Sequence, residues 1–174
     1  MIYQDECGIV EDLVREKGRI GKNNLGKAQK LYGQKTGKKH KKTGLISGYA
    51  KLPNAKKYCY IAPWIYDCNC DTVVFNTWLQ NILIPEINLI KKAFPGNPIT
   101  LIMDNVAYHK SQKTRDILEK NKINLKFQPP YSPDLNPIEH SWTHTKNDIR
   151  NDCKNLFFYD KLCSSLNTKS WTSL

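Results

Sequence analysis

Hydrophobic residues show their clearest periodicity between residues 71 and 94. Apolar side chains recur there at intervals of three and four, which is the spacing of one helical face. They are Phe75, Trp78, Leu79, Ile82, Leu83, Ile87, Ile90 and Phe94. Asp71 stands where an N-cap is expected, and Pro85 predicts a kink or a break. The segment therefore predicts a long amphipathic helix that is interrupted at Pro85.

Four segments in the first two thirds of the chain have strand character. Residues 2–5, 44–52 and 58–65 contain aromatic and β-branched residues, and Asn54 lies in the expected turn between the last two. Residues 99–103 form a nearly continuous apolar run, which is typical of a strand buried on both faces. These segments predict three early strands and a later central one.

The remainder of the chain alternates between helix and strand. Residues 111–122 predict a helix, residues 124–127 a strand, residues 129–137 a proline-rich loop, and Asn136 the start of a further helix. Three strands followed by this alternation predict an α/β fold with a mixed sheet.

The length of 174 residues allows one domain of ordinary size. We expect that domain to cover residues 1–150, and residues 151–174 to form a C-terminal tail with a last amphipathic helix. Asp104 directly follows the strand at residues 99–103, so we expect it at the carboxyl end of a sheet strand, where ligands gather in α/β folds.

The chain is strongly basic, with a formal charge of +11, and the positive charge is concentrated between Arg15 and Thr43. Eleven Lys and Arg residues stand there against one acid, and they include Lys38, Lys39, Lys41 and Lys42. Such a segment favours a polyanionic partner, with nucleic acid the leading candidate and these four lysines the candidate contacts. The alternative is a charged surface that only contacts solvent.

The N-terminus has no apolar stretch that could serve as a signal peptide, and no run reaches the length of a membrane span. We therefore expect a cytoplasmic protein without a membrane partner, whose six cysteines are reduced thiols. Cys68 and Cys70 form an isolated pair, which lacks the second pair of ligands that a structural zinc site needs.

Two carboxylates at predicted element ends are candidates for chemistry, and each has a structural alternative. A carboxylate at the edge of a core, such as Asp104, is costly unless a cation compensates it, but Asp also commonly caps a turn. Glu139 follows Asn136 and Pro137 in the pattern of a capping box, which would give it a purely structural role.

Asp5 and Glu6 are adjacent on a predicted strand, so their side chains point to opposite faces and only one of them can join a given site. His109 and His140 are, as histidines in general, expected to be surface or hydrogen-bonding residues rather than metal ligands.

Three motifs in combination change this assessment. They are Asp5-Glu6 after a short strand, residues 104–110 (DNVAYHK) after a buried strand, and residues 129–140 (PPYSPDLNPIEH). Over residues 2–150 the chain resembles the catalytic domain of mariner-superfamily DDE transposases, in particular the bacterial insertion-sequence branch. The thirty-four residues between Asp104 and Glu139 match the spacing typical of that superfamily.

The resemblance implies an α/β, ribonuclease-H-like mixed sheet flanked by helices. It also implies that Asp5, Asp104 and Glu139 are catalytic residues that bind Mg²⁺ or Mn²⁺, as two ions, while Asn105, His109 and the loop at residues 129–137 support the site. The expected reaction is metal-dependent DNA cleavage and strand transfer during transposition. Carboxylates suit this chemistry because hard cations can stabilise the charge that develops at the phosphate.

The resemblance further implies partners. They are transposon ends, target DNA and a second copy of the chain. Family members normally carry an N-terminal helix-turn-helix region, to which nothing here corresponds, so a separate N-terminal transposase fragment is another expected partner. Two alternative functions remain open: another ribonuclease-H-like nuclease, and an inactive DNA-binding remnant of a transposase.

Overall fold

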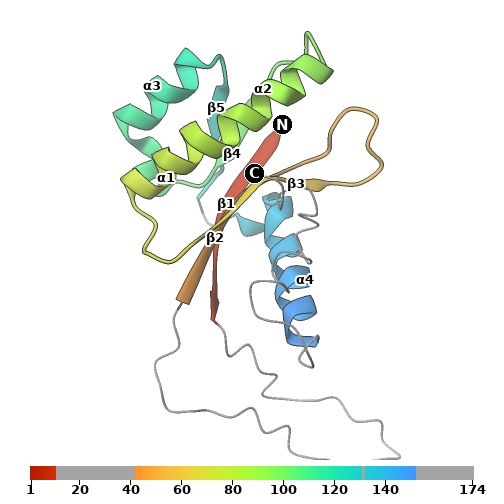
Figure 1. Cartoon of the computed structure of the whole chain (residues 1–174), viewed down its shortest axis with the longest axis vertical. Helices are drawn as coiled ribbons and strands as arrows, with labels where there is room; N and C mark the ends of the chain where they lie inside the picture. The colour runs from red at the N-terminus through yellow and green to blue at the C-terminus, as the bar shows by residue number, and fades with distance from the viewer. Residues whose placement is uncertain (11–41, 131, 152–174) are drawn as a thin grey trace, which may run out of the picture.

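The computed structural model describes residues 1–10, 42–130 and 132–151, which form a sheet with helices on both faces (Figure 1). The strands are β1 (Ile2–Val10), β2 (Lys42–Ala50), β3 (Cys59–Tyr66), β4 (Thr100–Met103) and β5 (Asn124–Phe127). The α-helices are α1 (Thr72–Trp78), α2 (Ile84–Ala93), α3 (Gln112–Lys120) and α4 (Pro137–Asn151). A π-helical segment, η2 (Leu79–Leu83), joins α1 to α2, and short 3-10 turns form η3 (Ala107–Lys110) and η4 (Pro133–Leu135).

The sheet is mixed and has the strand order β3-β2-β1-β4-β5. The first three strands pair antiparallel, whereas β1 pairs parallel with β4, and β4 pairs parallel with β5. This order places β1 in the centre of the sheet. It confirms the prediction of three early strands followed by alternating helices and strands.

The two faces of the sheet carry separate cores. On one face, Ile2, Leu101 and Met103 belong to a large cluster together with side chains of α1, η2, α2 and α3. On the other face, a smaller cluster packs against α4: Cys7, Ile9, Leu45, Ile138 and Trp142. Because β1 residues alternate between the faces, its odd-numbered side chains face α4.

The interrupted helix is present, and the structure shows how the chain accommodates Pro85. The Asp71 carboxylate caps α1 by accepting from the backbone N–H groups of Val73 and Val74. The helix does not stop before Pro85; it widens into η2 and continues as α2, with Pro85 in the first turn of α2. A π-helical turn changes the backbone hydrogen-bond pattern, so the missing N–H of proline can be accommodated without ending the helix.

Element boundaries differ from the sequence-based expectations mainly at β1. The strand does not end at Asp5 but runs to Val10, because β2 pairs with it along its length, from Tyr3↔Tyr49 to Val10↔Lys42. Asn54 does lie in the β2–β3 turn, with a positive φ of 67°. The predicted C-terminal helix lies outside the described residues.

None of the helices in the described ranges is long and apolar enough to cross a membrane. The cysteines within those ranges, Cys7, Cys59, Cys68 and Cys70, are free thiols.

Candidate active site

Parallel pairing of β1 and β4 brings two carboxylates to the same part of the sheet. Tyr3 lies opposite Ile102 in this ladder. Asp5 lies two residues beyond Tyr3, and Asp104 lies two residues beyond Ile102, so the two carboxylates follow the paired positions on the same side of the sheet. Asp104 directly follows β4, as expected from the sequence.

The third carboxylate, Glu139, is carried by the first turn of α4. The indole of Trp142, one helical turn further on, donates from Nε1 to Asp5 Oδ2 at 2.9 Å and stacks on the Tyr60 ring with centroids 5.1 Å apart. Tyr60 also bonds to Ser141 through its hydroxyl. These contacts fix α4 on the sheet and hold Glu139 near Asp5.

The three carboxylates line one cavity of about 420 Å³. Its other lining residues come from the segments that follow β4 and β5 and from the loop before α4: Asn105, Val106, Gln128, Pro129, Pro130, Ser132 and Asn136. The structure thus brings together three residues that are far apart in the sequence. No three His, Cys, Asp or Glu side chains in the described ranges converge closely enough to hold one metal ion between them. Their role as metal ligands stays a prediction.

Asp5 is the most strongly perturbed carboxyl of this cavity. Burial raises its pKa, and the negative charges of Glu139 and Glu6 raise it further, to about 7, despite the hydrogen bond from Trp142. A carboxylate in this position is unfavourable when it is charged and uncompensated. The cavity therefore attracts protons or cations.

Asp104 is held by a buried histidine. His109 lies 2.7 Å from Asp104 Oδ1 through Nδ1 and 3.0 Å from Glu6 Oε1 through Nε2, and its side chain is fully buried. Burial lowers the pKa of His109, but hydrogen bonds and charges of the two carboxylates outweigh this and raise it to about 9. At neutral pH the imidazole is therefore a cation that links Asp104 to Glu6.

The Asp104 carboxylate also caps the turn that follows it. Its Oδ1 accepts from the Val106 N–H at 3.0 Å, so the structural alternative for this residue is realised as well. Burial raises the pKa of Asp104, but the bonds from His109 and Val106 prevail and lower it. Asp104 is consequently an anion that is already oriented.

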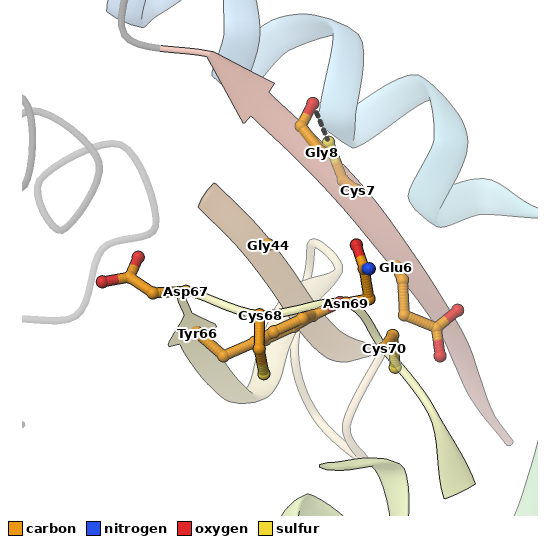
Figure 2. A pocket seen from close by; sticks show the side chains of 9 residues that line it. All are labelled: Glu6, Cys7, Gly8, Gly44, Tyr66, Asp67, Cys68, Asn69 and Cys70. Atoms are coloured by element: carbon orange, nitrogen blue, oxygen red, sulfur yellow. Dashed lines mark hydrogen bonds between the residues drawn. The ribbon is translucent and has the colours of Figure 1, made fainter. Parts of the chain in front are cut away.

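Glu6 points away from the three-carboxylate cavity, as the alternation of β1 requires. It lines a second cavity of about 420 Å³ together with Tyr66, Cys68 and Cys70 (Figure 2). Its carboxylate accepts from Gln4 Nε2 at 2.9 Å in addition to its contact with His109. Glu6 thus supports the site from behind and does not line it.

The capping box that offered a structural explanation for Glu139 is not formed. The Glu139 N–H donates to the backbone carbonyl of Asn136 at 3.1 Å. The side-chain Oδ1 of Asn136 is buried without a hydrogen-bond partner in the described part of the chain. Gln128 Nε2, from another residue of the cavity, is also buried and unpaired there. Leaving a buried polar atom unpaired costs free energy. Such atoms occur where a bound ligand or ion supplies the missing partner.

Other predicted residues lie elsewhere. Asn105 donates from Nδ2 to the Gln128 carbonyl at 2.6 Å, which ties the turn after β4 to the end of β5. His140 is exposed. The candidate DNA contacts Lys38, Lys39 and Lys41 lie outside the described residues, and the side chain of Lys42, at the start of β2, is not described either.

Comparison with known families decides the relationship of the chain. The model of a family described as DDE superfamily endonuclease matches residues 1–157. The chain belongs to this family. The match includes all three carboxylates of the cavity.

Curated relatives of this DDE endonuclease chain are similar over shorter stretches. It is 39% identical over 67 residues to the Tc3 transposase of Caenorhabditis elegans, a stretch that covers 38% of this chain and 20% of that protein. It is 47% identical over 45 residues to the insertion element IS630 uncharacterized 39 kDa protein of Shigella sonnei, covering 25% and 13% respectively. The matched stretches span between 13% and 29% of the lengths of the curated relatives.

Solved structures extend the similarity to the whole fold. The catalytic domain of Mos1 mariner transposase superposes with a TM-score of 0.62 at 15% identity, covering 96% of this chain and 67% of that one. A pre-cleavage Mos1 transpososome gives a TM-score of 0.64 at 15% identity, covering 96% and 55%. This likeness confirms the predicted ribonuclease-H-like mixed sheet flanked by helices.

Sequence reasoning missed two contacts of the candidate site. The bond from Trp142 to Asp5 could have been suspected, because Trp142 lies three residues after Glu139 and therefore on the same side of the helix. The Glu6–His109 contact joins residues 103 positions apart, and no local pattern indicates it.

Proposed function

We propose that this chain is the catalytic domain of an insertion-sequence transposase of the mariner-like superfamily, which cleaves DNA strands and transfers them to a target in a metal-dependent reaction. The observation that carries the proposal is the single cavity lined by Asp5, Asp104 and Glu139. Membership of the DDE endonuclease family and the transposases among the relatives support it.

The residues of the cavity fit divalent cations. Three carboxylates line it, and Asn136 Oδ1 adds a buried oxygen that lacks a partner in the described ranges. Mg²⁺ and Mn²⁺ prefer such oxygen ligands. Mos1 catalytic domain structures with Mn and with Mg support the same choice. We assign the metal-binding role to Asp5, Asp104 and Glu139 and propose two ions, the number that phosphodiester cleavage and strand transfer commonly use.

When bound by these carboxylates, such ions would supply positive charge to the attacking and departing oxygens of a phosphodiester. The protein contributes orientation. Trp142 fixes the Asp5 carboxylate, and His109 with the Val106 N–H fixes that of Asp104. These bonds reduce the reorganisation that ion binding and reaction would otherwise require.

The partners of this activity are transposon ends and target DNA. The net charge of +11 and the basic segment between Arg15 and Thr43 favour contact with phosphates. Mos1 structures of paired-end and strand-transfer complexes support an assembly on DNA. We propose a homodimer that pairs two ends, with the bacterial nucleoid in the cytoplasm as the location.

The proposal is tested by cleavage of a labelled duplex that carries the end of the encoding element, with a target plasmid present. Wild-type protein should give nicked and joined products with Mg²⁺ or Mn²⁺ and none with a chelator. Asp104→Asn and Glu139→Gln should abolish both products, whereas Asp116→Asn and Glu119→Gln, the same changes at exposed positions of α3, should not.

Each outcome separates this function from its alternatives. Metal-dependent nicking without joined product would favour another ribonuclease-H-like nuclease. A folded wild-type protein that binds DNA but cleaves nothing would favour an inactive remnant. Cleavage that survives Glu139→Gln would contradict the proposed site.

A further inference from the structure

Two cationic side chains lie over one aromatic ring at the edge of the sheet. The Lys110 Nζ is 5.6 Å from the centroid of the Phe127 ring, and the Arg115 Cζ is 5.9 Å from the same centroid. Arg115 also donates from Nε to the Lys110 carbonyl at 3.3 Å, which couples the end of η3 to α3. The face of an aromatic ring attracts cations, so Phe127 acts as a platform that holds both side chains.

In the part of the chain that the structure describes, the charge of Lys110 acts at a distance on Asp104, whose pKa it helps to lower, but the pair makes no direct contact with an anion. Neither Lys110 nor Arg115 forms an ion pair there, although both are exposed. Asp116, a neighbouring acid on α3, accepts a hydrogen bond from Gln112. Residues 105–130 contain six Lys and Arg residues against two acids. Two like charges that share one ring repel each other, and an anion that contacts both would relieve this repulsion.

Two residues of this surface are next in sequence to residues that bond to or line the three-carboxylate cavity. Lys110 directly follows His109, which is bonded to Asp104. Phe127 directly precedes Gln128, which lines the cavity and accepts from Asn105. Lys110 and Phe127 are thus each one residue along the chain from a group that is bonded to Asp104 or lines the cavity.

We infer that Lys110 and Arg115, held on Phe127, form a phosphate-binding surface that grips the DNA backbone next to the cleavage site. The inference rests on the proposed function, which supplies DNA as the ligand. The two residues lie outside the basic sequence segment between Arg15 and Thr43, and contacts to backbone phosphates contribute affinity without sequence preference. Its effect is to keep the strand in place before and during metal binding.

The test measures the affinity of the metal-free full chain for a fluorescent duplex of arbitrary sequence. Binding is monitored by fluorescence anisotropy, with a chelator present, at a series of salt concentrations. The double variant Lys110→Ala/Arg115→Ala is compared with Lys56→Ala/Lys57→Ala. The control removes the same charge from two exposed residues in the β2–β3 connection, away from α3 (Figure 1). Thermal unfolding of both variants verifies that each is folded.

The slope of log affinity against log salt should become shallower by about 0.9 for each phosphate that the protein no longer neutralises, hence by roughly 1.8 in the Lys110/Arg115 variant. The control should keep the wild-type slope. The variant Lys110→Arg/Arg115→Lys preserves the charges and should also keep the wild-type slope. Phe127→Leu preserves packing but removes the aromatic face, so it should weaken DNA binding, although less than the double alanine variant does.

Equal slopes and affinities for the double variant and its control would overturn the inference, as would a wild-type chain that does not bind the duplex at low salt. The outcome is separable from that of the proposed function, because no metal or cleavage is involved. If the double variant differs from its control in DNA binding but the protein does not cleave DNA, this surface is established while the catalytic proposal fails. If the protein cleaves DNA but the double variant binds like its control, the catalytic proposal stands and this surface does not bind phosphate.

Discussion

Neutralising Asp5 should stabilise the metal-free protein while it destroys the site. Burial raises the pKa of Asp5 from 3.8 to about 7, with Glu139 and then Glu6 adding to the effect. A change of one in pKa corresponds to about 1.4 kcal/mol, so holding this carboxylate charged costs the fold up to ~4 kcal/mol at alkaline pH. Asp5→Asn removes the charge and keeps an oxygen that can accept from Trp142.

The stability that Asp5→Asn gains over wild type should increase with pH. Between pH 3.8 and about 7 the unfolded chain loses the Asp5 proton before the folded chain does, so the stability of wild type falls as pH rises through this window. Below it, both forms of wild type carry the proton and the Asn variant has no advantage. Above it, the advantage of Asp5→Asn should reach a plateau of a few kcal/mol.

Urea unfolding in a chelator, followed by tryptophan fluorescence from pH 4 to pH 9, measures this difference. Asp116→Asn, the same change at an exposed position, should follow wild type at every pH. An Asp5→Asn variant that is less stable than wild type at pH 8, or whose advantage does not change with pH, would refute the electrostatic description of the cavity. The variant should also fail to cleave DNA, because stability and function are opposed at this residue.

Three further predictions concern Glu139, His109 and a core residue away from the cavity, Trp78. Glu139→Gln should change the free energy of unfolding by no more than about 0.5 kcal/mol, because glutamine could also complete a capping box and none is formed here, while cleavage falls by about 100-fold. Near-wild-type cleavage by a folded Glu139→Gln variant would restore the capping explanation. His109→Ala should destabilise the fold by about 3 kcal/mol, because it removes the buried cation that links Asp104 to Glu6. It should also lower the affinity for Mn²⁺ measured by calorimetry; unchanged affinity would contradict a positioning role. Trp78→Phe should cost about 1–3 kcal/mol in thermal unfolding without changing DNA cleavage per folded molecule, because it deletes a buried bond to the Ala62 carbonyl; a selective loss of activity would be unexpected.

Local patterns were sufficient for much of the fold. The strand Asn124–Phe127 and the cap at Asp71 agree with expectation, because turn residues and apolar periodicity define them within a few positions. The length of β1 was wrong, since it depends on pairing with β2, which is distant in the sequence. The π-helical turn before Pro85 was also not predicted, because the packing of Trp78 and Leu83 maintains the helix where local preference would break it.

The candidate site was accessible to sequence reasoning because its three carboxylates lie in recognisable motifs. Its supporting contacts were not. Glu6, His109 and Asp104 meet only when β1 and the turn after β4 are side by side, and Lys110 and Arg115 meet over Phe127 only when α3 packs against β5. Such contacts depend on tertiary structure, and a single sequence carries no local signal for them.

The measurement that tests the central claim most directly is anomalous X-ray scattering from crystals of the protein soaked in Mn²⁺. Anomalous density should appear in the cavity between Asp5, Asp104 and Glu139, as two peaks that contact carboxylate oxygens, and it should vanish in the Asp104→Asn variant. Density only in the second cavity beside Glu6, or a persistent absence of density at saturating Mn²⁺, would contradict the assignment of these three carboxylates as the metal ligands of a DNA-cleaving site.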